Sequence, residues 1–243
     1  MSTFSLVGEP ERILYRSDAF QAKLFAALGI IGTALKRSRR PYIAFSGGID
    51  STAVMVLCEM VRPGIPVCWS DDELEVPETV AYMTFMQRVA GPQFQAFTGG
   101  ATHAGWFTPW SGEPYWRLPL AGTIRARSSE WHIDHNYDLV ILGTRMEENR
   151  RRRDWMVQSG PIYGGSTITR RCCPVWDWSR DDVWALIAGQ NIPYHTAYNR
   201  MEALGIPRKR QRVGPFPLVP RDFMDQLWPE LLPHLIARYG NHW

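Results

Sequence analysis

Hydrophobic and polar positions along the chain follow two patterns, one with helical spacing and one of short apolar runs. A helix that begins near Ser17 or Asp18 is predicted by apolar residues spaced four, three and four apart, namely Leu24, Leu28, Ile31 and Leu35. Apolar runs predict buried strands over 41–45, 65–69, 93–97 and 138–142. Further helices are predicted over 50–60, 77–89, 123–136, 179–188, 196–204 and 221–239. This alternation predicts an α/β fold with a doubly wound, mostly parallel sheet, in which ligands bind at the carboxyl ends of the strands.

Composition limits the class of protein. The 243 residues suffice for one sizeable domain, and 45% hydrophobic with 21% charged residues excludes disordered, collagen-like and coiled-coil chains. Eleven Trp and 18 Pro indicate long aromatic connecting segments, chiefly 98–122. The longest apolar run, residues 24–35, is shorter than the roughly 20 residues of a membrane span. With charged residues ahead of that run and four cysteines that form no disulfide framework, we expect a soluble cytoplasmic protein that binds no membrane.

The segment most informative about chemistry joins the first predicted strand to its helix. Residues 45–52 read Phe-Ser-Gly-Gly-Ile-Asp-Ser-Thr. Two glycines allow a tight turn whose amides face an anion, and the helix adds unpaired N–H groups and its dipole. The predicted phosphate donors are Ser46, Gly47, Gly48, Ser51 and Thr52. The segment is neither a Walker A loop nor a Gly-x-Gly-x-x-Gly fingerprint, and a Ser-Gly-Gly turn alone is equally typical of a plain strand-to-helix connection.

The full segment and three others carry a family resemblance. The hexapeptide Ser-Gly-Gly-x-Asp-Ser matches the pyrophosphate loop of the adenine-nucleotide α-hydrolase superfamily. Residues 69–79, with Asp71 six residues before Pro-Glu-Thr, are similar to the second-strand signature of phosphoadenylyl-sulfate reductases. Residues 142–149 resemble the family's Leu-Gly-x-Arg-x-x-Glu-Ser segment, with Asn149 in place of Ser. Residues 174–184 and 192–198 resemble its Asp-Trp motif and the segment that follows.

The resemblance implies a site for ATP or a related adenylyl nucleotide, with its phosphates on residues 46–52. Asp50 would order the loop or hold Mg²⁺, while the alternative is a carboxylate that only caps the helix. Arg145 would reach a phosphate or sulfate, while the alternative is a solvent-facing side chain. Asp71 is the third candidate catalytic residue, beside Asp50 and Arg145. Glu148 completes the candidate nucleotide-binding set.

The chain departs from the reductases in its thiols. Those enzymes carry a nucleophilic cysteine in a C-terminal Glu-Cys-Gly-Leu-His segment, and this sequence has no cysteine after Cys173. Thiol-dependent reduction is therefore disfavoured unless a partner supplies the thiol. The adjacent Cys172 and Cys173 are poorly placed to share a metal, and His132 with His135 lacks an evident third ligand.

Positive charge concentrates after the Arg145 motif, although the formal net charge is only +3. Arg150–Arg153 are consecutive, and the same cluster is expected to include residues 170, 171, 208–210 and 212. They form either a solvated loop or a rim that binds nucleotide phosphates or a nucleic-acid backbone. Candidate base-stacking residues are Trp155, Trp176 and Trp178.

These observations predict three segments: an N-terminal helical part (1–40), a nucleotide-binding domain (41–200) and a C-terminal extension (201–243). The leading function is an ATP pyrophosphatase or adenylyltransferase that cleaves ATP between the α- and β-phosphates with Mg²⁺. The alternatives are a sulfonucleotide reductase that uses an external thiol and a nucleotide-dependent nucleic-acid-binding module. The sequence does not identify the acceptor substrate or the oligomeric state, for which a homo-oligomer is one option.

Overall fold

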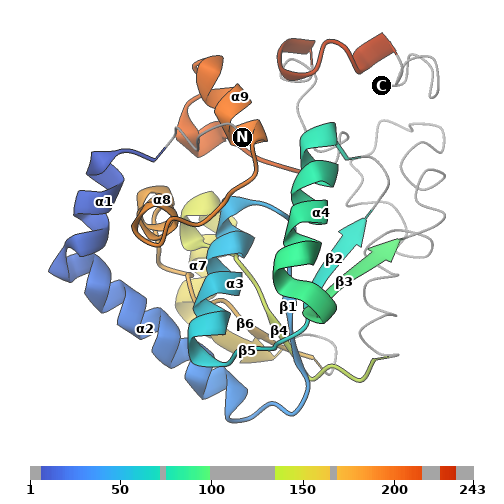
Figure 1. The fold of residues 1–243 in the computed structure, drawn as a ribbon. Helices are drawn as coiled ribbons and strands as arrows, with labels where there is room; N and C mark the ends of the chain where they lie inside the picture. Colours follow the sequence, from blue (N-terminus) through green and yellow to red (C-terminus); the bar gives the residue numbers. More distant parts are fainter. Residues whose placement is uncertain (1–6, 72–74, 99–134, 165–168, 215–224, 234–243) are drawn as a thin grey trace.

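Six strands form one sheet in the part of the chain that the computed structural model describes, residues 7–71, 75–98, 135–164, 169–214 and 225–233. The strand order is β3-β2-β1-β4-β6-β5 (Figure 1), and every neighbouring pair is parallel except β5 with β6. The bounds are β1 Pro41–Ala44, β2 Val67–Asp71, β3 Phe94–Thr98, β4 Leu139–Ile141, β5 Ile162–Gly164 and β6 Arg170–Cys172. The predicted mostly parallel α/β sheet is confirmed, and β5 and β6 are additions that the apolar pattern did not predict.

Helices flank this sheet. They are α1 Glu9–Arg16, α2 Asp18–Leu35, α3 Ile49–Val61, α4 Pro77–Ala90, α7 Arg150–Ser159, α8 Arg180–Gly189 and α9 Ala197–Ala203, with short 3-10 turns η1 Gly91–Gln93, η3 Met146–Glu148 and η4 Arg208–Arg210. Ser17 and Ser179 cap α2 and α8 as predicted, because each side chain accepts a hydrogen bond from a backbone N–H of the first turn.

Two of the predicted helices are not confirmed by the structure. For the helix predicted over 123–136, residues 123–134 lie outside the described residues, and His135 and Asn136 form a turn. The predicted helix over 221–239 is described only over 225–233, where short helical pieces alternate with turns. Pro229 explains the break, since proline lacks the N–H that a continuing helix needs. The predicted long segment over 98–122 lies outside the described residues after Thr98.

The two faces of the sheet bury different clusters because side chains alternate along each strand. Ile43, Val67 and Ile141 face the large core, which also takes apolar residues of α2, α3, α4 and α8. Tyr42 and Val140 face the opposite side in a smaller cluster.

Helix α2 is long and apolar enough to cross a membrane by length and composition alone, a test that core helices also pass. Six of its residues are buried in the present fold, namely Phe20, Leu24, Ala27, Ile31, Ala34 and Leu35. It therefore packs as a core helix of the α/β domain.

Helix α1, which the sequence did not predict, packs along α8 (Figure 1). Gly189 allows the close approach, because a Cβ there would lie 2.1 Å from the ring of Tyr15. Arg12 donates to Asn191 at 2.9 Å, and Glu11 pairs with Arg208 at 2.6 Å. The N-terminal helix is thus fixed by residues from the last third of the chain.

The candidate site lies where the direction of the strand order changes. From β1 the chain continues to β2 and β3 on one side and then returns to β4 on the other side of β1. The carboxyl ends of β1 and β4 therefore lie side by side at a topological switch point, where α/β sheets bind ligands. Gly143, just after β4, contacts the first turn of α3 so closely that a Cβ there would lie 2.7 Å from the backbone carbon of Asp50.

Candidate active site

The loop between β1 and α3 presents unpaired backbone donors. Gly47 has φ +77°, a left-handed conformation that favours glycine, and a Cβ there would lie 2.6 Å from Met83 Cε. Gly48 is extended and is the N-cap of α3. Within the described segments, the amides of Gly47, Gly48, Asp50 and Ser51 donate no hydrogen bond. Such a run of free N–H groups at the positive end of a helix is suited to a phosphate group.

The loop hydroxyls divide into an open and a buried set. Ser46 is exposed, and its Oγ lies 3.2 Å from that of Ser51, which donates to the Gly48 carbonyl at 2.9 Å. Thr52 is fully buried, donates to the same carbonyl at 3.0 Å and lies 3.1 Å from the hydroxyl of Tyr82. Thr52 therefore supports the loop from inside in this structure, while Ser46 is open to a ligand.

Side chains from α4 and residues 193–198 contact the loop on its buried side. The Nδ1 atom of His195 accepts from the amide of Ala197 at 3.1 Å, so Nε2 carries the proton and lies 2.8 Å from Thr79 Oγ1. Burial lowers the pKa of His195 to about 4, which keeps the ring neutral. Tyr198 accepts from the amide of Ile49 at 3.2 Å, and burial raises the pKa of its hydroxyl to about 12.

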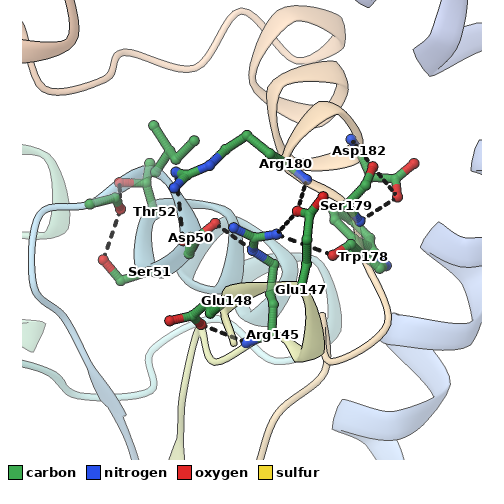
Figure 2. A network of polar contacts seen from close by, with 12 residues as sticks. Asp50, Ser51, Thr52, Arg145, Glu147, Glu148, Trp178, Ser179, Arg180 and Asp182 are labelled. Atoms are coloured by element: carbon green, nitrogen blue, oxygen red, sulfur yellow. Dashed lines mark hydrogen bonds and ion pairs between the residues drawn. The ribbon is translucent and has the colours of Figure 1, made fainter. Parts of the chain in front are cut away.

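Four charged side chains meet beside the loop (Figure 2). Asp50 Oδ1 lies 2.9 Å from Arg145 Nε, and Oδ2 lies 3.8 Å from Arg180 Nη1. Glu147 Oε2 accepts from Arg145 Nη1 and from the backbone N–H of Arg180, both at 2.6 Å. Arg145 Nη1 also donates to the Trp178 carbonyl at 3.2 Å. The cluster joins α3, the turn after β4 and the start of α8.

The predicted roles of Arg145 are clarified by this cluster. Its side chain is 2% exposed, so the solvent-facing alternative is wrong. Burial alone would lower its pKa, but the Asp50 and Glu147 carboxylates outweigh burial and the pKa is raised. Arg145 fixes Asp50 and hence the first turn of α3, whereas a direct contact with phosphate stays a prediction.

Magnesium on Asp50 does not fit this arrangement, because each oxygen of the carboxylate faces a guanidinium group. The described segments also contain no group of three His, Cys, Asp or Glu side chains that could hold a metal ion. Asp50 thus matches the loop-ordering alternative.

Two other candidate residues lie outside the part that the structure describes. Asp71 ends β2, beside β1, but its side chain is not described. His132, of the candidate pair with His135, also lies outside the described residues.

Glu148 holds the turn after β4. Its Oε1 accepts from the backbone N–H of Arg145 at 2.8 Å, and its Oε2 pairs with Arg152.

The site also contains Glu147 and Arg180, which the sequence analysis does not select. For Arg180 the sequence offers one signal. It is an arginine in the first turn of a Ser-capped helix, a position where the helix dipole favours acidic residues.

All four cysteines are buried and free. Burial raises the pKa of Cys172 to about 12 and that of Cys173 to about 11, and it raises those of Cys58 and Cys68 too. Because the thiolate is the reactive form, none of these groups is a ready nucleophile at neutral pH.

The predicted arginine cluster is divided by the fold. Arg150–Arg153 form the exposed first turn of α7 and not a loop. Arg170 is at the amino end of β6, paired with Leu139, and so lies at the opposite edge of the sheet. Among the candidate stacking residues, Trp178 is only 1% exposed and packs on Phe20, whereas Trp155 is exposed on α7.

The comparison with family models decides the family. The model of the phosphoadenosine phosphosulfate reductase domain matches residues 40–217, most of the chain. The chain belongs to this family. No curated protein sequence gives a significant match.

Solved structures share the fold of this phosphoadenosine phosphosulfate reductase domain. A phosphoadenylyl-sulfate reductase from Candida auris, in a phosphate complex, is 15% identical with a TM-score of 0.60, over 88% of this chain and 98% of that one. The FMN adenylyltransferase of Candida glabrata in complex with ATP is 11% identical with a TM-score of 0.51, over 78% and 64%. The U34-tRNA thiolase of Methanococcus maripaludis, with its [4Fe-4S] cluster, is 13% identical with a TM-score of 0.53, over 90% and 75%.

Proposed function

We propose that the protein binds ATP and cleaves it between the α- and β-phosphates, transferring the adenylyl group to an acceptor or to water. The observation that carries this proposal is the set of four unpaired amides at residues 47, 48, 50 and 51, at the N-terminus of α3. They offer hydrogen bonds to a pyrophosphate group without any covalent nucleophile. The solved adenylyltransferase with ATP, which shares the fold, supports this reading as an analogy.

In the proposed reaction, catalysis depends mainly on stabilising the charge of the leaving group. An acceptor oxygen or nitrogen forms a bond to the α-phosphorus while the bond to the bridging oxygen breaks, and the electron pair leaves with pyrophosphate. Negative charge therefore grows on the leaving group, where fixed N–H donors and a helix dipole stabilise it. The Asp50, Arg145 and Arg180 contacts hold these donors in place.

A second candidate is reduction of a sulfonucleotide, which the family membership favours. That reaction needs a thiolate to attack sulfur, and the four thiols of this sequence are buried with raised pKa values. The reductase would then depend on an external thiol. We rank it second for that reason.

Two assays separate these candidates. ATP is supplied with radiolabelled pyrophosphate, and exchange of label into ATP is expected if an adenylylated intermediate forms; pyrophosphate release is followed in parallel to detect direct transfer. The sulfonucleotide is supplied with a reduced dithiol, and sulfite is measured. Sulfite without exchange or pyrophosphate release would reject the first proposal in favour of the second.

Two glycine-to-alanine variants, one in the loop and one as a control, test the loop assignment. Gly47→Ala forces a side chain into φ +77° and against Met83, so ATP affinity measured by calorimetry is expected to fall at least tenfold. Gly164→Ala adds the same methyl group where a Cβ meets nothing within 4 Å, and it should leave affinity unchanged. Equal affinities of the two variants would contradict the loop assignment.

A further inference from the structure

The basic turn of α7 follows the Arg145 turn directly. Asn149 caps this helix by accepting from the backbone N–H of Arg152 at 2.8 Å, and residues 150–153 form the first turn. All four arginine side chains are exposed, that of Arg150 to 94%. The turn follows β4, so it lies at the same edge of the sheet as the loop of residues 46–48.

This turn is electrostatically unfavourable by itself. The N-terminus of a helix carries positive partial charge and is stabilised by acidic side chains, yet the first turn of α7 contains four cations and no acid. Arg150 reaches Asp154 only at 3.8 Å, and Arg152 pairs with Glu148. Arg151 and Arg153 form no ion pair with any residue of the described segments. An external polyanion would relieve the repulsion between these like charges.

A second basic segment is attached to the same charged cluster. Arg180 Nη2 donates to the Gln211 carbonyl at 3.2 Å, which ties residues 208–212 to the Asp50 contacts. Lys209 and Arg212 are exposed and form no ion pair within the described residues. Because Arg152 is linked through Glu148 to the Arg145 backbone, basic segments from two distant parts of the sequence connect to one cluster.

An aromatic side chain accompanies the arginines. Trp155 on α7 is 41% exposed and meets Tyr163 edge to face, with ring centroids 4.1 Å apart. One edge of the indole is thus held while part of the ring is open to solvent. Cationic side chains beside an exposed aromatic ring are the combination that binds single-stranded nucleic acids, through phosphates and stacked bases.

We propose that the first turn of α7, Trp155 and residues 208–212 form a docking surface for single-stranded nucleic acid. The proposed function places the phosphates of ATP on the loop amides, which leaves these side chains for a second, longer anion. Binding of the strand does not itself require ATP cleavage. A role of the docked strand as adenylyl acceptor rests in addition on the proposed function.

Binding is tested by fluorescence anisotropy with labelled 20-nucleotide RNA and DNA strands of mixed sequence, across a KCl series from 50 to 300 mM. The test variant is Arg151→Ala/Arg153→Ala. Its matched control is Arg37→Ala/Arg39→Ala, which removes the same charge from exposed residues just before β1, at the opposite edge of the sheet. Net charge alone would affect both variants equally.

For the test variant we expect affinity at 100 mM KCl to fall by about tenfold or more, and the slope of log affinity against log salt to decrease by about 1.4, from about 0.7 per lost phosphate contact. The control should stay within twofold of the wild type. Trp155→Ala should lower affinity at least fivefold with an unchanged salt slope, since stacking is not electrostatic. No saturable binding by the wild type at 50 mM KCl, or equal losses in the two double variants, would overturn the proposal. ATP titration of the wild type reports separately on the proposed function.

Discussion

Replacing Asp50 with asparagine keeps the shape of the side chain and removes the charge that two arginines share. Asp50 Oδ1 and Oδ2 lie 2.9 Å and 3.8 Å from Arg145 and Arg180, and the Arg145 side chain is 2% exposed. Removing one partner of a fully buried ion pair costs about 3–5 kcal/mol. The Asp50 side chain keeps 23% exposure and Arg145 keeps Glu147, so we expect a smaller loss of about 2–3 kcal/mol.

Urea unfolding followed by circular dichroism measures this loss, and the Tm should fall by about 4–12 °C for a chain of this length. Asp181→Asn is the matched control, because Asp181 is exposed in the first turn of α8 and has no ion pair in the described part of the chain. It should cost no more than about 1 kcal/mol.

A double variant tests the pairing itself. Asp50→Asn/Arg145→Met removes both charges, so its loss should be smaller than the sum of the two single losses by about 1–2 kcal/mol. If Asp50→Asn changed stability by less than about 0.5 kcal/mol and abolished a magnesium requirement for ATP binding, the carboxylate would be a metal ligand and our reasoning would be wrong.

Further predictions concern packing, pH and thiols. Gly143→Ala should cost about 1–3 kcal/mol and weaken ATP binding, because its Cβ meets the backbone of α3, whereas Gly29→Ala, with nothing within 4 Å, should not destabilise the fold. His195 has a pKa lowered to about 4 against about 6.5 unfolded, so the unfolded chain binds the proton first as pH falls. The free energy of unfolding should therefore decrease by about 3 kcal/mol between pH 7 and pH 4 because of this histidine. In His195→Gln, the free energy of unfolding measured with urea should depend less on pH over this range. Cys172 and Cys173 should react with iodoacetamide at pH 8 only after unfolding, and rapid labelling of the native protein would contradict their burial.

The sheet could be predicted because its strands are strongly apolar and separated by glycine and proline. The four predicted strands, β1 to β4, begin within two residues of their predicted starts, and the predicted loop at 46–48 lies at the switch point. By contrast, β6 begins Arg170-Arg171 and pairs through its backbone, which leaves no apolar signature. Helix α7 begins with four arginines, a pattern that indicates a solvated loop or an anion-binding rim, and its buried face contributes only Met156.

Within the site, the sequence identified residues by chemical type but not their partners. Asp50 and Arg145 were both selected, yet their 2.9 Å contact depends on Gly143 bringing β4 against α3, which no local pattern encodes. Arg180 was missed for the same reason, because its counter-ion lies 130 residues earlier in the chain. The sequence predicts that Thr52 faces phosphate, whereas in the structure it lies one turn into α3 and its hydroxyl donates to the Gly48 carbonyl.

The packing of α1 on α8 has a consequence for synthesis of the chain. Between the end of α1 at Arg16 and the start of α8 at Arg180 the ribosome adds about 160 residues, which takes roughly 8 to 30 s at 5–20 residues per second. Throughout that interval Tyr15 lacks the surface around Gly189, and Glu11 lacks Arg208. Phe20 of α2 is also without Trp178, on which it packs in the folded protein, for almost all of this time. Nascent chains stalled before residue 189 should thus remain sensitive to protease near residues 9–35 and be retained by chaperones that bind exposed apolar segments, whereas chains released after residue 208 should not.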